Sequence, residues 1–243
     1  MTCLAICLGL TRVDPDAYGG WDGDCPGADW DVNRFSAWCH AAGFDGVTAL
    51  VNQFAQPAYL EPTFKAAAKS LTADDLLVLY FSGHGGQKPD LDGDEIDGQD
   101  ETLVLWDGQL VDDVIASYLR QVPAGVRIWF FTDSCHSGTN YRGGPVRRAK
   151  PSRPGSIRLS DRSTKGLRAS LLHFGGCADP RYSYGLNGRG VFTSTMLKVA
   201  SRARKSISYR ELFDRTAERM PDYQTPTISE WGKPSFADRE ALR

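Results

Sequence analysis

The sequence contains no Cys-x-x-Cys motif and no apolar run that approaches the roughly 20 residues needed to span a bilayer. Its six cysteines are spread over 243 residues, unlike the dense spacing of a small disulfide-stapled domain. The apolar N-terminus, MTCLAICLGL, lacks the basic region of a signal peptide and is expected to form a strand. We therefore expect free thiols, a cytoplasmic location and no membrane partner.

An excess of charge of either sign is also missing. The formal net charge is −2, which gives no overall bias toward nucleic acid or an anionic membrane. The hydrophobic content of 41% is ordinary for a globular protein, and the chain is long enough to bury a sizeable core. We expect one domain over residues 1–243 that is monomeric and has no nucleic-acid partner.

Apolar runs of strand length recur along the chain and alternate with segments of helical spacing. The expected strands are Thr2–Leu8, Val47–Val51, Leu76–Phe81, Thr102–Leu105, Val126–Thr132 and Ala169–Phe174. One expected helix starts at Asp31, and the others span Val111–Leu119, Gly190–Ala200 and Ser208–Met220. This alternation predicts an α/β fold, with helices around a mainly parallel sheet of about six strands.

Two of the apolar runs lead into small-residue segments that hold a histidine and a cysteine. LLVLYFSGHGGQ contains His84, and RIWFFTDSCHSG contains Cys135, about 50 residues further along the chain. In parallel sheets, reacting groups gather at the carboxyl ends of the strands, and both residues are expected just past such an end. An imidazole beside a thiol can deprotonate it and later protonate a leaving amine. The pair predicts a nucleophile, Cys135, and a base, His84, although either residue alone would more often be a packed core or loop residue.

Neighbouring residues suggest further roles in such a site. The backbone amide of Gly85 is a candidate donor to an oxyanion. Asp133 stands two residues before Cys135, and a carboxylate there favours a cationic substrate side chain, because Arg or Lys would form a charge-assisted hydrogen bond with it. The absence of an Arg near Cys135 disfavours a substrate with Asp at the cleavage site.

The segments FSGHGGQ and TDSCHSG resemble the His and Cys boxes of the caspase superfamily, in its metacaspase and bacterial orthocaspase branch. YGGWDGD, DGDEIDGQDETLVLWDG and LVDD fit the bacterial members, and the similarity extends to GVFTSTML near Val191. The resemblance implies a caspase-like three-layer α/β/α sandwich. It also implies a cysteine endopeptidase that cuts protein substrates after Arg or Lys through a Cys–His dyad and an acyl-enzyme. The alternative is a catalytically silent, caspase-like binding or regulatory module.

The same resemblance implies an acidic S1 pocket, the pocket that holds the substrate side chain before the cleaved bond. Its members would be Asp133, Ser82 and an aspartate that opens the first long helix. Asp31 fits this last position best, because the helical spacing starts directly after it, and Asp29 is its rival. Either carboxylate would also stabilise a helix N-terminus without any role in binding.

An acidic segment holds ten carboxylates and one basic residue between Lys88 and Asp113. Metacaspases, by resemblance, bind calcium through residues that map to Asp100, Asp112 and Asp113, whereas a fourth ligand position is Arg142 here. No other cofactor is implied. A solvated acidic rim that attracts basic substrates is the alternative interpretation.

A basic segment without apolar periodicity covers residues 141–168 and is expected to be a flexible loop. Exposed loops are natural sites of proteolysis, and an enzyme with an acidic S1 pocket would find its preferred residues there. We therefore expect self-processing in this loop, with an electrostatic tether to the acidic segment as the alternative. Its basic residues are Arg142, Arg147, Arg148, Lys150, Arg153, Arg158, Arg162, Lys165 and Arg168.

Overall fold

The computed structural model describes residues 1–89, 98–136, 164–176, 190–203, 206–222, 224–232 and 236–242. For Cys135 and His136 only the backbone is described. Eight strands occur in this part of the chain: β1 (Cys3–Gly9), β2 (Gly46–Val51), β3 (Leu76–Pro89), β4 (Gln99–Val104), β5 (Gln109–Val111), β6 (Arg127–His136), β7 (Ser170–Gly176) and β8 (Thr227–Trp231). The α-helices are α1 (Ala28–Ala41), α2 (Pro57–Ser70), α3 (Asp112–Leu119), α4 (Val191–Arg202) and α5 (Tyr209–Ala217), and two short 3-10 helices span Pro15–Tyr18 and Asn52–Phe54.

The main sheet has the strand order β2-β1-β3-β6-β7-β8. The first five of these strands are parallel, and β8 runs antiparallel to β7. Beyond the point where β1 ends, β3 continues and pairs with β4, which in turn pairs with β5, both antiparallel. The parallel sheet with β3 and β6 at its centre confirms the expected α/β architecture.

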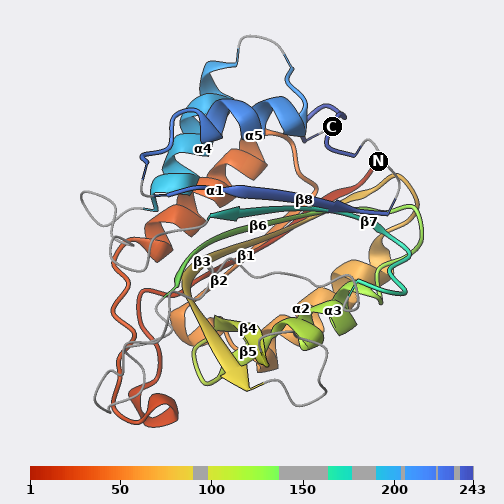
Figure 1. The fold of residues 1–243 in the computed structure, drawn as a ribbon. Coiled ribbons are helices and arrows are strands. Elements are labelled where there is room, and N and C mark those ends of the chain that lie inside the picture. Colours follow the sequence, from red (N-terminus) through yellow and green to blue (C-terminus); the bar gives the residue numbers. More distant parts are fainter. Residues whose placement is uncertain are drawn as a thin grey trace.

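Helices cover both faces of the sheet, as Figure 1 shows: α1, α4 and α5 lie on one side, and α2 and α3 on the other. The central strands are therefore buried on both faces. Along β1, Cys7 packs toward the layer of α1 and α4, while Ile6 and Leu8 pack toward the layer of α2 and α3. None of the described helices combines the length and the apolarity needed to cross a bilayer.

The four expected helices are confirmed as α1, α3, α4 and α5, whereas α2, β5 and β8 were not predicted. The prediction missed α2 because its segment carries Pro57 and Pro62, which are typical of turns, although Leu60, Phe64 and Ala68 form its buried face at helical spacing. All five residues of β8 are half-buried, so the strand shows neither alternation nor a continuous apolar run.

Two strands are longer than their apolar runs suggested. The prediction placed His84 and Cys135 just past strand ends, but β3 continues to Pro89 and β6 to His136. The small residues after each apolar run stay extended because the two strands keep pairing with each other as far as Gly85 and His136. Both residues therefore lie within paired backbone, at the carboxyl-terminal part of the parallel region.

A buried histidine in β7 is a specific source of acid sensitivity. His173 is 3% exposed, its Nε2 lies 3.0 Å from Thr132 Oγ1, and its ring stacks on Phe130 with centroids 4.9 Å apart. Burial lowers the pKa of His173 to about 4. The folded protein therefore keeps this ring neutral at pH values at which an unfolded chain would protonate it.

We expect His173 to reduce the free energy of unfolding by about 3 kcal/mol as the pH falls from 6.5 to 4, because only the unfolded state binds the proton in that range. Urea unfolding of the wild type and His173→Gln at several pH values gives the free energy of unfolding as a function of pH. The slopes of these two plots against pH differ by the contribution of His173. The variant is expected to lose the extra slope even if it is less stable throughout. His40→Gln, at an exposed position on α1, is the matched control and should keep the wild-type slope. Equal slopes for the wild type and His173→Gln would contradict the prediction.

Candidate active site

The register between β3 and β6 brings the predicted base and nucleophile together. His84 is the direct parallel-strand partner of Cys135, and Ser82 is the partner of Asp133. Neighbouring strands lie about 4.8 Å apart, so each pair is adjacent on the backbone. The segments that carry the four residues are far apart in the sequence, and the pairing of two central strands is what unites them.

His84 is held by the segment that follows β1. Its imidazole is 6% exposed, and its Nε2 lies 3.3 Å from the backbone carbonyl oxygen of Asp24. The indole of Trp21 covers the imidazole, with ring centroids 5.1 Å apart and planes tilted by 50°. Tyr18 packs edge-on against Trp21 and donates a 2.7 Å hydrogen bond to the carbonyl of Leu105, which anchors the segment.

These contacts determine which nitrogen of His84 can act as a base. A carbonyl oxygen only accepts hydrogen bonds, so the contact with Asp24 places the ring proton on Nε2. Nδ1 is then the unprotonated nitrogen, and it is buried without a hydrogen-bond partner among the described residues. Burial lowers the pKa of His84, against an opposing effect of hydrogen bonds from the ring to the backbone of Asp24 and Gly23. The imidazole is therefore neutral at neutral pH, and no described group occupies its basic Nδ1.

Asp133 lies in β6, beneath the start of α4. Its Oδ2 accepts hydrogen bonds from the backbone N–H and the hydroxyl of Thr193, at 2.8 and 2.7 Å. Because that hydroxyl has a single proton, the hydroxyl of Tyr80, 2.8 Å from Thr193 Oγ1, is the donor in the contact between them. Burial raises the pKa of Asp133, while the two bonds from Thr193 act in the opposite direction.

Asp31 lies in the first turn of α1 and is 1% exposed. Its Oδ2 accepts a 2.7 Å hydrogen bond from the backbone N–H of Gly190 and a longer one, 3.4 Å, from the Ser82 hydroxyl. Its Oδ1 is buried and has no hydrogen-bond partner in the described part of the chain. Burial raises the pKa of Asp31 to about 8, and the neighbouring charge of Asp133 contributes to this rise.

The structure thus groups Asp31, Ser82 and Asp133, which the sequence assigned to one pocket. Asp29, the rival of Asp31, is only half-buried, and its Oδ1 accepts a hydrogen bond from the backbone N–H of Trp30, next to it in the first turn. This is the helix-stabilising arrangement that the sequence offered as the alternative for either carboxylate. Of the two aspartates, Asp31 is the one beside Asp133.

Sequence reasoning missed Gly190 and Thr193, which organise the two carboxylates. A Cβ atom at position 190 would stand 2.3 Å from Asp133 Oδ2 and 2.5 Å from Asp31 Oδ2, so only glycine lets both carboxylates approach the backbone this closely. Thr193 follows in the first turn of α4. The only signal in the sequence was that both residues stand at the start of an expected helix. That position does not indicate which strand the helix faces.

The proposed oxyanion donor, Gly85, lies on β3 next to His84. Its register partners are His136 on β6 and Leu103 on β4, so it stands where β3 takes up β4 as a new neighbour. This places Gly85 beside the residue that follows Cys135. Its role in binding an oxyanion stays a prediction.

The residues expected to bind calcium lie near each other along the chain at β4 and the start of α3. Asp100 and Asp112 are buried, and Asp113 is half-buried. The described residues nevertheless contain no group of three His, Cys, Asp or Glu side chains arranged to hold a metal ion. Residues 90–97 of the acidic segment lie outside the described part, as does residue 142. Calcium binding by Asp100, Asp112 and Asp113 therefore stays a prediction, and no catalytic step is assigned to the metal.

The expected self-processing loop falls mostly outside the described residues as well, which resume at residue 164. Within its last part, the carbonyl of Lys165 accepts a 3.1 Å hydrogen bond from Arg120 Nε, just after α3. The end of the basic segment is therefore fixed on the α2 and α3 side of the sheet. The remaining predictions for residues 141–163 are untested.

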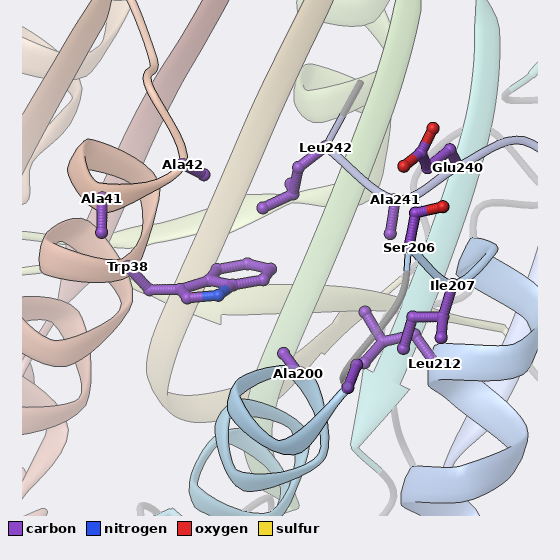
Figure 2. Close-up of a pocket in the computed structure, with 11 residues that line it drawn as sticks. Trp38, Ala41, Ala42, Ala200, Ser206, Ile207, Leu212, Glu240, Ala241 and Leu242 are labelled. Atoms are coloured by element: carbon purple, nitrogen blue, oxygen red, sulfur yellow. The ribbon is translucent and has the colours of Figure 1, made fainter.

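A cavity of about 460 Å³ lies elsewhere, at the other end of α1 and α4. Figure 2 shows Trp38 and Leu242 projecting into it, between Ala41 of α1 and Ala200 of α4. The candidate site uses the opposite ends of these helices, at Asp31 and Gly190. The lining is mainly small and aliphatic, with Ser206 and Glu240 as its polar side chains, and no histidine or cysteine lines it. It is therefore not a candidate for the active site.

Comparison with known proteins agrees with this geometry. The family model for the caspase domain matches residues 12–233. Metacaspase-1 of Coccidioides immitis is 49% identical over 76 residues, which are 29% of this chain and 16% of that protein. Metacaspase-1 of Arabidopsis thaliana is 48% identical over 73 residues, 28% of this chain and 20% of the relative. The match therefore spans a fifth or less of the length of these curated relatives.

Solved structures extend the similarity to the whole chain. Protein GSU0716 of Geobacter sulfurreducens has a TM-score of 0.79 and 33% identity, with 100% of this chain and 98% of that one covered. Pro-sf-caspase-1 has a TM-score of 0.56 at 15% identity, covers 94% of this chain and 86% of its own, and shares the fold. The chain therefore belongs to the caspase-domain family, with metacaspases among its relatives, and this is a family of cysteine peptidases.

Proposed function

We propose that the chain is a cysteine endopeptidase that hydrolyses peptide bonds after Arg or Lys. The observation that carries the proposal is the register of β3 and β6. It pairs His84 with Cys135, two residues further along the strands than the pair Ser82 and Asp133. The base, the nucleophile and two of the three expected S1 residues are thus attached to the same two strands, and the third, Asp31, lies at the start of α1. Peptide and protein chains with a basic side chain are the expected substrates.

In the proposed mechanism, Nδ1 of His84 takes the proton of the Cys135 thiol, and the thiolate attacks the carbonyl carbon of the scissile bond. The carbonyl oxygen becomes an oxyanion that accepts a hydrogen bond from the amide of Gly85. When the tetrahedral intermediate collapses, the C–N bond breaks and His84 returns its proton to the leaving amine. Water, deprotonated by the same imidazole, then hydrolyses the acyl-enzyme and regenerates the thiol.

The preference for a basic P1 residue rests on the charge of the pocket. Asp31 and Asp133 are both buried, and no cation pairs with them in the described residues. The Oδ1 of Asp31 is a buried acceptor to which none of the described residues donates a hydrogen bond. A guanidinium or ammonium group would supply both the missing charge and the missing hydrogen bonds.

A catalytically silent binding module is the second candidate, since a cleft with an acidic pair could hold a basic peptide without cutting it. The tautomer of His84 supports the enzyme, because it leaves a basic nitrogen that no described residue occupies and that suits proton transfer. Self-processing in the basic loop is part of the proposal, because residues 141–168 offer nine Arg and Lys side chains to such a pocket.

Wild-type protein is expected to cleave fluorogenic peptides with Arg or Lys at P1 and to leave peptides with Asp or neutral P1 residues uncut. Cys135→Ala and His84→Ala should each reduce kcat/KM by roughly 1,000-fold or more, because nucleophile and base act as a unit. N-terminal sequencing should find new termini after basic residues of the loop in the wild type and none in Cys135→Ala.

The matched control for the thiol is Cys3→Ala, which removes a different thiol, buried in β1, and should leave cleavage unchanged. If no peptide is cleaved by intact or processed protein while basic peptides still bind, the silent module is the correct reading. Undiminished cleavage by Cys135→Ala would rule out the assigned nucleophile.

The acid limb of kcat, measured at saturating arginine peptide, is expected to lie below pH 6.5, because burial lowers the pKa of His84 from that value. Trp21→Ala uncovers the imidazole and should move this limb to higher pH, since a better-solvated ring gains a proton more easily. Initial rates between pH 5 and 9 give the profile. An acid limb above pH 7 in the wild type, or one that does not move in Trp21→Ala, would count against the assigned base.

Gly190→Ala is expected to raise KM for arginine peptides by roughly tenfold or more, with a smaller change in kcat, because the methyl group would displace the carboxylates that hold P1. Gly108→Ala is the matched control, because a Cβ there meets no atom within 4 Å. Steady-state kinetics of both variants, with circular dichroism to verify folding, provide the comparison. A folded Gly190→Ala enzyme with wild-type KM would argue against the assigned S1 pocket.

A further inference from the structure

The two carboxylates of the candidate pocket are close neighbours in a buried place. Both Oδ2 atoms lie close to the position that a Cβ atom of residue 190 would occupy, at 2.3 Å for Asp133 and 2.5 Å for Asp31. Each residue is less than a tenth exposed. Two negative charges this close and this poorly solvated repel each other strongly, so the empty pocket favours a state with only one of them.

The hydrogen bonds decide which carboxylate keeps its charge. Asp133 accepts two short bonds from Thr193, which stabilise its ionised form. Asp31 accepts one short bond from Gly190 and a long one from Ser82, and no described residue donates to its Oδ1. A proton is therefore accommodated at lower cost on Asp31.

The described groups around Asp31 do not offer a counter-charge. On β3, Tyr80 and Ser82 are neutral, and burial raises the pKa of the Tyr80 hydroxyl well above its usual range. On α4, the nearby residues are Gly190 and Thr193. Burial is the main cause that raises the pKa of Asp31 to about 8, and the charged neighbours on β6 and α1, Asp133 and Asp29, add to this rise.

We propose that the free protein holds one proton on Asp31, and that a basic P1 side chain displaces this proton when it binds. This exchange rests on the proposed function and adds a rule to it: each substrate that binds near neutral pH causes Asp31 to release a proton. The guanidinium or ammonium group replaces the proton as the positive partner of the pair, so the buried pocket carries the same net charge before and after binding. A neutral P1 residue cannot make the exchange.

The exchange predicts how affinity depends on pH. Below the pH at which Asp31 titrates, a basic peptide must expel the proton, so its Kd is expected to fall by about tenfold for each unit of rising pH. Above that pH the dependence disappears. A peptide with citrulline at P1, which has the shape of arginine without its charge, should bind weakly at every pH.

The first experiment needs no substrate. The protein is labelled with ¹³C at the aspartate carboxyl carbons, and the Asp31 signal is identified by its loss in Asp31→Asn. Its titration is expected at about pH 8 and should move down by more than about one unit in Asp133→Asn, where the like charge is gone. Titration below about pH 5 would overturn the proposal, because it would mean that a cation already neutralises the pair.

The second experiment uses Cys135→Ala, which should bind an arginine peptide without cutting it. Calorimetry at pH 7 in phosphate and in Tris, buffers of different ionisation enthalpy, gives the number of protons released. About one proton per peptide is expected, none when Asp31→Asn is added, and one again with Asp29→Asn as the matched control. Binding without release overturns the exchange and leaves the peptidase proposal intact, whereas a protein that binds no basic peptide overturns both.

Discussion

The parallel pairing of β3 with β6 determines where every residue of the candidate site stands. The paired region runs from Leu76 and Arg127 to Gly85 and His136 without interruption. Buried side chains on both faces hold this register, because a shift by one residue would turn each of them to the opposite layer. The hydrophobic core therefore sets the alignment of His84 with Cys135. No interaction within the site itself is needed to create that alignment.

The same packing buries Asp31 and Asp133, and the burial of two carboxylates lowers the stability of the fold. This cost indicates that the pair serves a purpose other than stability. Buried carboxylates destabilise a fold unless they are paired or fully hydrogen-bonded, and apolar residues of similar size are often more stable in their place. Thr193 satisfies Asp133, but Oδ1 of Asp31 is left without a described donor. A purely structural network is normally complete. In the proposed pocket, a substrate cation would supply the donor that the described residues do not give Asp31.

The sequence predicted the parts of this protein whose signals are local. Continuous apolar runs indicated the central strands, and helical spacing after Asp31 indicated α1. Residues that act through tertiary contact gave little signal: Gly190 and Thr193 meet Asp133 only because α4 packs over β6. α2 was missed because Pro62 is read as a helix breaker, although the fold tolerates it where Leu60 and Phe64 are buried. Local propensity is decisive only where tertiary packing does not override it.

Burial shifts the pKa values of both the proposed base, His84, and the proposed pocket residue Asp31. Desolvation disfavours charge, so it lowers the pKa of His84 and raises that of Asp31. We propose that at neutral pH the imidazole is consequently able to accept a proton and that Asp31 is uncharged until a cation binds. In the proposed scheme, a substrate with a basic P1 residue brings the charge that ionises Asp31, while the base is ready beforehand. Specificity and catalysis then respond to pH through different groups, the first through KM and the second through kcat.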